Sequence, residues 1–185
     1  QNHLVNNLNN TNIGILLTMY SGMRIGEICA LKWSDIDLQS GIIRISKTVQ
    51  RINDKIGNSK TKIIVGSPKS RTSEREIPIP NFLVNILNER RQNENNYILS
   101  GTHKLIEPRT MQNRFKSVLK KCGIRNVNFH LLRHTYATVC IENGFDAKTV
   151  SELLGHSNVN ITLNRYVHSS LDTKKKYVEK LNFVA

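Results

Sequence analysis

Acidic residues, cysteines and long apolar runs are all scarce in this sequence. Its 14 Asp and Glu face 27 Lys and Arg, which gives a formal net charge of +13 over 185 residues. No apolar run approaches the roughly 18 residues that a membrane-spanning helix needs, and the N-terminus carries no signal-peptide pattern. These absences favour nucleic acid over a membrane as the polyanion that so basic a chain binds.

The cysteine pattern excludes two further classes of protein. Cys29, Cys122 and Cys140 are odd in number and far apart, which fits neither a disulfide framework nor a C-x-x-C metal site. We expect them to be reduced, buried, small apolar residues of a cytoplasmic protein. The sequence also has no internal repeat and no low-complexity linker, so we expect one domain. Because the chain does not begin with Met, we further expect it to be the C-terminal domain of a longer protein.

Helical periodicity dominates both ends of the chain. Ile13, Leu16 and Leu17 recur at a spacing that places them on one face, which predicts a helix over 12–20 that is ended by Gly22. The same pattern predicts further helices over 24–31, from an Asn81 cap to Leu87, from Met111 to Gly123, from an Asn128 cap to Gly144, over 147–154, and around Leu171, Val178 and Leu181.

The middle of the chain has the pattern of extended segments. Short runs at 42–45, 48–52, 62–65 and 75–79 are separated by turns rich in Lys, Arg, Ser and Gly. They predict a small antiparallel sheet of about three strands near residues 40–80. The expected fold class is therefore α+β, a mainly helical domain with this small sheet.

The stretch "NFHLLRHTYAT", from Asn128 to Thr138, offers an anion site. His130 and Arg133 are three residues apart near a helix N-terminus, where backbone N–H groups and a guanidinium suit phosphate oxygens. The alternative is that Arg133 caps or forms a salt bridge with a neighbour, and that His130 is an ordinary polar core residue. His130 and His134 also imitate the zinc helix H-E-x-x-H, but Leu131 replaces the glutamate and no third ligand is evident, so no metal is expected.

Two other basic residues lie in positions that suit an active site. In "SGMRIGEICALKWSDID", residues 21–37, Arg24 follows a Gly22 turn at a helix start, and Glu27 lies one turn on, where its carboxylate can hold the guanidinium. In "SPKSRTSEREIPIP", residues 67–80, Lys69 occupies a basic turn between two extended runs. Taken singly, each pattern is more typical of a solvated surface residue.

The stretch "GHSNVNITLNRY", residues 155–166, pairs a histidine with a tyrosine. A tyrosine phenol keeps its proton until about pH 10, so Tyr166 is a poor nucleophile at neutral pH unless neighbouring groups assist it. The alternative is that His156 is a helix-end residue after Gly155, and that Tyr166 is a half-buried aromatic near a helix start.

Considered together, these motifs resemble one family over nearly the whole chain. They match in order and in spacing the catalytic set of the tyrosine recombinases, and they are most like integrases of bacterial conjugative transposons and temperate phages. The residues that carry the resemblance are Arg24, Lys69, His130, Arg133, His156 and Tyr166.

The resemblance implies a reaction and a role for each residue. Arg24 and Arg133 would clamp the scissile phosphate, and Tyr166 would attack the phosphorus, leaving a 3′-phosphotyrosine link and a free 5′-hydroxyl. Reversal of this step by another strand would exchange strands without ATP. The implied activity is site-specific DNA recombination, the integration or excision of a mobile element.

The remaining members of the set would handle protons and charge. The resemblance implies that Lys69 protonates the departing 5′ oxygen, that His130 acts as acid or base near the tyrosine and phosphate, and that His156 hydrogen-bonds a non-bridging oxygen. No cofactor and no metal is implied. Because acids are few, and Asp35 and Asp37 lie in an apparent turn, a two-metal nuclease is poorly supported.

Other basic residues are candidates for DNA backbone contacts that weaken as salt rises. The predicted DNA-binding residues are Lys47, Arg51, Lys60, Lys62, Arg71, Lys116 and Lys120.

The resemblance also predicts partners and a setting. It implies double-stranded DNA attachment sites, a tetramer on DNA in the full-length protein, N-terminal core-binding and arm-binding domains that this chain lacks, and a place in the bacterial cytoplasm, associated with the nucleoid. The 171–185 tail would dock on a neighbouring protomer or pack in cis. Three alternatives stay open: a type IB topoisomerase, a non-catalytic DNA-binding module and a histidine metal hydrolase.

Overall fold

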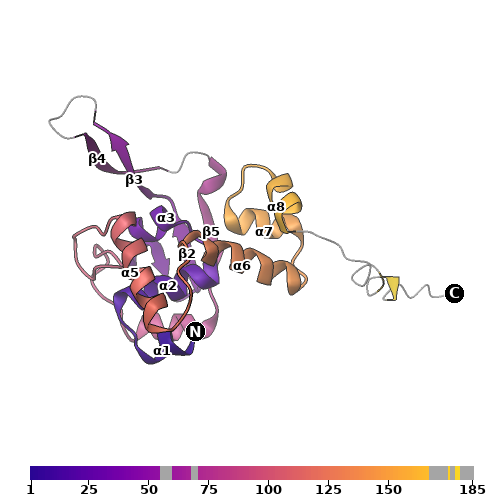
Figure 1. Cartoon of the computed structure of the whole chain (residues 1–185), viewed down its shortest axis with the longest axis horizontal. Coiled ribbons are helices and arrows are strands. Elements are labelled where there is room, and N and C mark those ends of the chain that lie inside the picture. Colours follow the sequence, from indigo (N-terminus) through magenta and orange to yellow (C-terminus); the bar gives the residue numbers. More distant parts are fainter. Residues whose placement is uncertain (55–59, 68–70, 167–174, 176–177, 180–185) are drawn as a thin grey trace.

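The computed structural model describes residues 1–54, 60–67, 71–166, 175 and 178–179. Among these residues helices predominate, and strands are confined to the span between residues 36 and 78 (Figure 1). The helices are α1 (Asn2–Asn6), α2 (Asn10–Ser21), α3 (Ile25–Ala30), α4 (Asn81–Asn88), α5 (Pro108–Lys121), α6 (His130–Glu142), α7 (Ala147–Leu154) and α8 (Val159–Tyr166). The strands are β1 (Ile36–Asp37), β2 (Ile42–Ile45), β3 (Thr48–Asn53), β4 (Thr61–Gly66) and β5 (Arg75–Pro78). None of the described helices is long and apolar enough to cross a bilayer.

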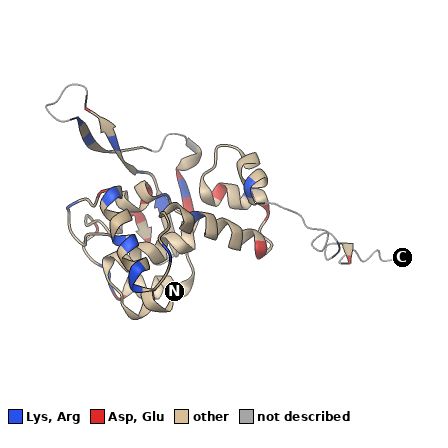
Figure 2. Cartoon of the chain, in the orientation of Figure 1, with Lys and Arg blue, Asp and Glu red and all other residues tan. Residues whose placement is uncertain are grey.

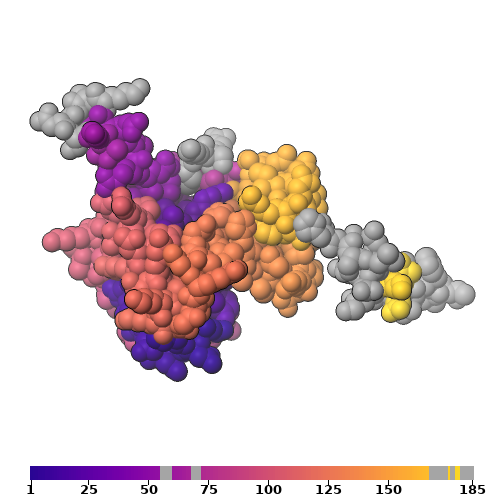
Figure 3. Space-filling model, in the orientation of Figure 1, coloured from indigo at the N-terminus to yellow at the C-terminus, as the bar shows by residue number. Residues whose placement is uncertain are grey.

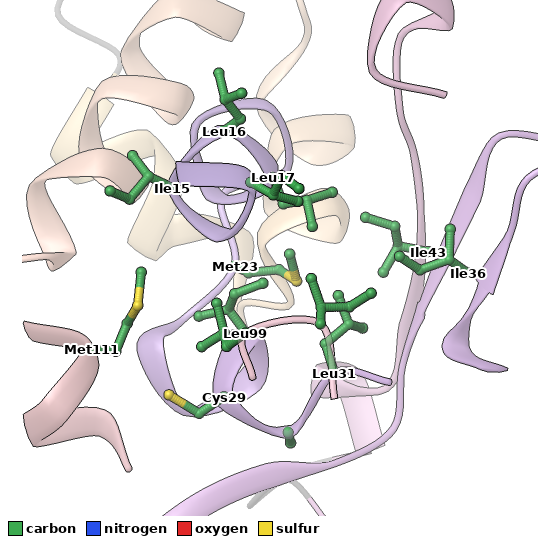
Figure 4. Close-up of a cluster of buried hydrophobic side chains, with 14 of the residues drawn as sticks. Ile15, Leu16, Leu17, Met23, Cys29, Leu31, Ile36, Ile43, Leu99 and Met111 are labelled. Atoms are coloured by element: carbon green, nitrogen blue, oxygen red, sulfur yellow. The ribbon is translucent and has the colours of Figure 1, made fainter. Parts of the chain in front are cut away.

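Helix α2 forms the centre of the main core. Asn9 caps it, because the Asn9 side chain accepts a hydrogen bond from the Asn12 backbone N–H at 3.0 Å. Unlike a surface helix, α2 is buried on several sides, with Ile15, Leu16 and Leu17 all removed from solvent. Figure 4 shows these side chains among apolar residues of α3, β2 and α5. This packing fixes the C-terminal end of α2, which leads directly into the candidate site.

Gly22 ends α2 in a left-handed conformation, with φ of 63°, and its N–H donates to the Thr18 carbonyl. A methyl group added at Gly22 would lie 2.5 Å from Tyr136 Cδ1 and 2.7 Å from Leu154 Cδ2. Only glycine therefore lets α2 turn while touching both α6 and α7.

Replacing Gly22 with alanine should therefore destabilise the protein. The variant combines left-handed strain of about 1 kcal/mol with overpacking of a further ~1–3 kcal/mol. Gly123→Ala is the matched control, because Gly123 has nearly the same φ, 67°, yet a methyl there would meet no described atom within 4 Å. In denaturant unfolding, the free energy of unfolding of Gly22→Ala should be well below that of Gly123→Ala. Equal losses of stability in the two variants would contradict the packing account.

The strands form two small antiparallel sheets. One has the order β1-β2-β5, with Ile43 opposite Ile77, and the other pairs β3 with β4, with Arg51 opposite Ile63. Ile43 and Ile77 of the first sheet are fully buried, and Val49 of β3 is buried in the same core, whereas Val65 of β4 is 43% exposed. The first sheet and β3 therefore contribute to the core, while Val65 of β4 faces solvent. The β3–β4 hairpin projects from the body in Figure 1. The predicted α+β class, with small antiparallel sheets, is confirmed, but the single predicted sheet is two sheets. Of the predicted runs, 42–45 and 75–79 pair with each other, and 42–45 also pairs with β1, which was not predicted, whereas 48–52 and 62–65 pair only with each other as the hairpin.

Two predicted helix caps were wrong. Helix α4 includes Asn81, with Pro80 at the cap position. Helix α6 begins at His130 rather than after Asn128, because Phe129 is buried edge-on against Phe115 at 5.2 Å between ring centroids. His130 is consequently the first residue of α6. The helix predicted around 171–184 lies almost wholly outside the described residues.

Helices α6, α7 and α8 share a second, smaller apolar cluster. Ala137 and Cys140 of α6 pack with Val150 and Leu154 of α7, and Tyr166 of α8 packs against this group. In Figure 3, α7 and α8 form one block at the right of the described body, whereas the β3–β4 hairpin lies at the upper left. Tyr166 lies at the end of α8 and not near a helix start, as one reading of the sequence supposed, because Val159–Tyr166 forms a helix that the sequence analysis did not predict.

Candidate active site

Arg24 is anchored at the start of α3 by Glu27. The Arg24 backbone N–H donates to Glu27 Oε2 at 2.8 Å, and Arg24 Nη1 pairs with Glu27 Oε1 at 2.8 Å. The predicted role of Glu27 in holding this guanidinium is confirmed. The Arg24 side chain remains 38% exposed, so it can meet a ligand from solvent.

A second arginine, Arg75 of β5, also binds Glu27. The sequence analysis did not predict this residue as part of the site. Arg75 Nη2 lies 2.9 Å from Glu27 Oε2 and its Nη1 lies 3.1 Å from Oε1, a two-pronged pair in which both side chains are at most 6% exposed. Arg75 Nε also donates to the Leu153 carbonyl at 2.7 Å, which ties α3, β5 and α7 together. Burial alone raises the pKa of Glu27, but hydrogen bonds and charges from Arg75 and then Arg24 outweigh it and hold the pKa below its usual value.

Glu27→Gln should be strongly destabilising, because it leaves the Arg75 charge buried without a counter-charge. We expect a loss of about 3–5 kcal/mol in the free energy of unfolding. Glu76→Gln is the matched control, since the Glu76–Arg44 pair is exposed on both sides and is worth at most about 1 kcal/mol.

The same pair predicts a pH dependence. Since the folded-state pKa of Glu27 is lowered, its stabilising effect is fully present above the ordinary value near 4.5 and is lost as pH falls through the lowered pKa. Urea unfolding between pH 3 and 7 would test this. A Glu27→Gln variant with the wild-type pH profile would contradict it.

Arg133 reaches the same place as Arg24 from the first turn of α6. Its Nη1 donates to the Gly22 carbonyl at 2.9 Å and its Nη2 to the Leu154 carbonyl at 2.8 Å, while Arg24 Nη2 donates to the next carbonyl, Gly155, at 3.1 Å. Arg133 is 2% exposed. Burial, and then the like charge of Arg24, lower the pKa of Arg133 to about 9, which leaves it charged at neutral pH. The two guanidinium groups therefore lie side by side, as an anion clamp requires.

His156 follows the left-handed Gly155 that ends α7. Its Nδ1 lies 2.8 Å from the hydroxyl of Thr162, which is buried in α8. Burial, followed by the charges of Arg133 and Arg24, lowers the pKa of His156 to about 4. His156 is thus a neutral imidazole. One of its nitrogens is hydrogen-bonded to Thr162, and the charges of the two arginines lower its pKa.

Tyr166 brings a phenol to this group from the last turn of α8. Its hydroxyl lies 2.6 Å from Nδ1 of His134, with ring centroids 5.8 Å apart. Burial raises the pKa of Tyr166, and the charges of Arg133 and Arg165 offset this only in part. The phenol is therefore protonated at neutral pH.

His130 lies exposed at the start of α6, with its ring edge-on to His134 at 4.5 Å. Burial, and then the charges of His134 and Arg133, lower the pKa of His130. Among the residues that the structure describes, no group of three metal-ligating side chains gathers here or elsewhere.

The structure thus brings together five of the six residues predicted as a catalytic set. Arg24 and Arg133 bind the two carbonyls that precede His156, and Tyr166 and His130 both contact His134, the residue after Arg133. The sixth, Lys69, lies outside the described residues. Sequence reasoning assigned no role to Arg75 and considered His134 only as a zinc ligand. The i, i+4 spacing of His130 and His134 was the one available signal for the latter.

Several of the predicted DNA-binding residues are already paired with acids. Lys47 lies 3.6 Å from Asp35, and Arg51 lies 2.6 Å from Glu107. Lys62 similarly lies 3.5 Å from Asp54. Lys60, Lys116 and Lys120 are exposed, and the side chain of Arg71 lies outside the description. Figure 2 shows Lys and Arg along the β3–β4 hairpin and α5.

Comparison with known proteins identifies relatives over most of the chain. The model of the phage integrase family matches residues 2–172. A XerC-like tyrosine recombinase of Caldanaerobacter subterraneus subsp. tengcongensis is 36% identical over 186 residues, which cover 90% of this chain and 48% of the relative. The transposase from transposon Tn916 of Enterococcus faecalis is 25% identical over 91% of this chain and 44% of its own length.

A solved structure shares the fold. The Tn1549 transposon integrase in complex with transposon right end DNA superposes with a TM-score of 0.72 at 24% identity, covering 92% of this chain and 58% of that one. The chain therefore spans about half the length of the curated relatives it matches.

Proposed function

The chain belongs to the phage integrase family, and on that premise we propose that it cuts and rejoins double-stranded DNA at specific sites through a covalent bond to Tyr166. The observation that carries this proposal is the convergence of Arg24 and Arg133 on the adjacent carbonyls of Gly155 and Leu154, next to His156 and Tyr166. Two adjacent guanidinium groups suit the non-bridging oxygens of one phosphate.

In the proposed cleavage step, the arginines stabilise the negative charge that builds on the phosphate as Tyr166 attacks. His156 is neutral, and with Nδ1 held by Thr162 it can offer its other nitrogen to a phosphate oxygen. Tyr166 gives its phenol proton to a neighbouring histidine as its oxygen bonds to phosphorus, and the bond to the 5′ oxygen breaks as that oxygen takes a proton from Lys69. The chain itself supplies all of these groups, so the step uses no cofactor.

We further propose that the whole protein carries N-terminal DNA-binding domains and acts as a tetramer on attachment-site DNA, in the bacterial cytoplasm and on the nucleoid. Support comes from the partial coverage of the relatives, and from the Tn1549 integrase having been solved on transposon-end DNA. Exposed Lys60, Lys116 and Lys120 and the charge of +13 suit contacts to the DNA backbone. This chain alone should accordingly bind DNA weakly.

The proposal can be tested without knowing the target site. The protein is incubated with a library of duplexes that are randomised around a nick placed to trap the cleaved strand, and SDS-resistant protein–DNA adducts are isolated and sequenced. We expect adducts that share one sequence and that form equally with a chelator present. The absence of any adduct, also with a longer protein that carries the N-terminal domains, would overturn the proposal. Adducts accompanied by relaxation of supercoiled DNA but no strand exchange would instead indicate a topoisomerase.

A further inference from the structure

The hydroxyl of Tyr166 has a partner outside the six-residue set. Nδ1 of His134 lies 2.6 Å from it, a short distance for a hydrogen bond between an imidazole and a phenol. His134 is in the second turn of α6 and Tyr166 is the last residue of α8, so the bond joins two helices. Because the Tyr166 ring also packs on the small apolar cluster, ring and oxygen are both fixed.

The surroundings of His134 keep its imidazole neutral. The charged and titratable groups that the structure places around it are His130, Arg133, Arg165 and Tyr166. Burial is the largest cause that lowers the pKa of His134, followed by the charges of Arg165 and Arg133. A neutral imidazole with its hydrogen on Nε2 presents a lone pair at Nδ1, which can accept a hydrogen bond and then a proton from the phenol.

We propose that His134 is a catalytic residue that takes the phenol proton of Tyr166 as the tyrosine attacks phosphorus. This rests on the proposed function. The Tyr166 O–H bond breaks and its proton moves to His134 Nδ1, while the tyrosine oxygen bonds to phosphorus and the 5′ oxygen leaves with a proton from Lys69. In religation His134 returns the proton to Tyr166, so the cycle is balanced.

The geometry favours His134 over His130 for this proton. His134 is within hydrogen-bond distance of the phenol oxygen, whereas the described contact of His130 is a perpendicular ring contact with His134. His130 also lies at the exposed start of α6, one turn from Arg133. Of the two histidines, His134 is therefore the one that serves the nucleophile.

The test is the pH dependence of single-turnover adduct formation, measured on DNA selected by the library. His134→Asn keeps a polar group near the position of Nδ1 but cannot take up a proton near neutral pH. At pH 7 it should be slower than the wild type by about 10²-fold or more. Its rate should then rise roughly tenfold per pH unit towards pH 9.5, as the phenolate fraction grows, whereas the wild type should be nearly flat. The matched control is His103→Asn, a change at an exposed histidine.

A second substrate separates this role from that of Lys69. With sulfur in place of the bridging 5′ oxygen, the leaving thiolate needs no proton, so the substrate should rescue Lys69→Ala and leave the His134→Asn defect in place. His134→Ala should regain rate when imidazole is added.

Three outcomes would overturn the inference. These are a wild-type rate for His134→Asn, a loss that is the same at every pH, and rescue of His134→Asn by the sulfur substrate. If the wild type itself forms no adduct, the proposed function fails first. Failure of the inference and failure of the proposed function are therefore distinguishable.

Discussion

Tyr166→Phe should abolish the covalent adduct, a loss of at least roughly 10⁴-fold in rate, because no other group replaces the attacking oxygen. The phenylalanine ring retains the packing of Tyr166 on the cluster formed by α6 and α7, and the change removes one partly buried hydroxyl. The melting temperature and DNA affinity should therefore stay close to those of the wild type. The measurement is an SDS gel of protein incubated with nicked DNA, together with thermal unfolding of both proteins.

Tyr136→Phe is the matched control for this change. Tyr136 packs on the same cluster as Tyr166, so the variant removes the same atom from the same part of the protein. It should form the adduct at nearly the wild-type rate. An adduct from Tyr166→Phe, or an equal loss in Tyr136→Phe, would show that the tyrosine is not the nucleophile.

Arg133→Lys should slow cleavage by about 10²- to 10³-fold, the usual effect of removing a preorganised donor from a developing negative charge. The Arg133 guanidinium donates to the carbonyls of Gly22 and Leu154 with two nitrogens in a fixed fork. A lysine ammonium is a single point charge and cannot reproduce that geometry. Single-turnover cleavage under saturating protein gives the rate.

Arg133 is buried, so its replacement also removes its hydrogen bonds to the backbone and lowers stability. A second variant is needed to separate the loss of rate from the loss of stability. Arg24→Lys should show a comparable loss of rate with a smaller loss of stability, because Arg24 is 38% exposed. Arg91→Lys, at an exposed pair with Glu94, is the matched control and should change neither quantity. Wild-type cleavage by both Arg24→Lys and Arg133→Lys would contradict the phosphate clamp.

Local chemistry explains which parts of the fold could be predicted. The helix over 147–154 was predicted with its observed bounds, because an apolar period ends at a glycine that adopts φ of 63°. The caps at Asn81 and Asn128 were wrong, because Pro80 in one case and burial of Phe129 in the other determine where the helix begins. The division of the strands into two sheets depends on which edges are already paired, and sequence periodicity does not encode that.

The same contrast holds in the candidate site. The contact of Glu27 with Arg24 was predictable, because side chains three positions apart lie on the same side of a helical turn. The pair of Glu27 with Arg75 and the bond of His134 to Tyr166 join residues 48 and 32 positions apart. Such contacts depend on how α3 meets β5 and how α6 meets α8. No local pattern could have indicated them.

The most direct measurement is mass spectrometry of the trapped adduct after digestion with nuclease and protease. The account predicts a nucleotide joined through its 3′-phosphate to the oxygen of Tyr166. Attachment of the nucleotide to any other residue of the chain would contradict it.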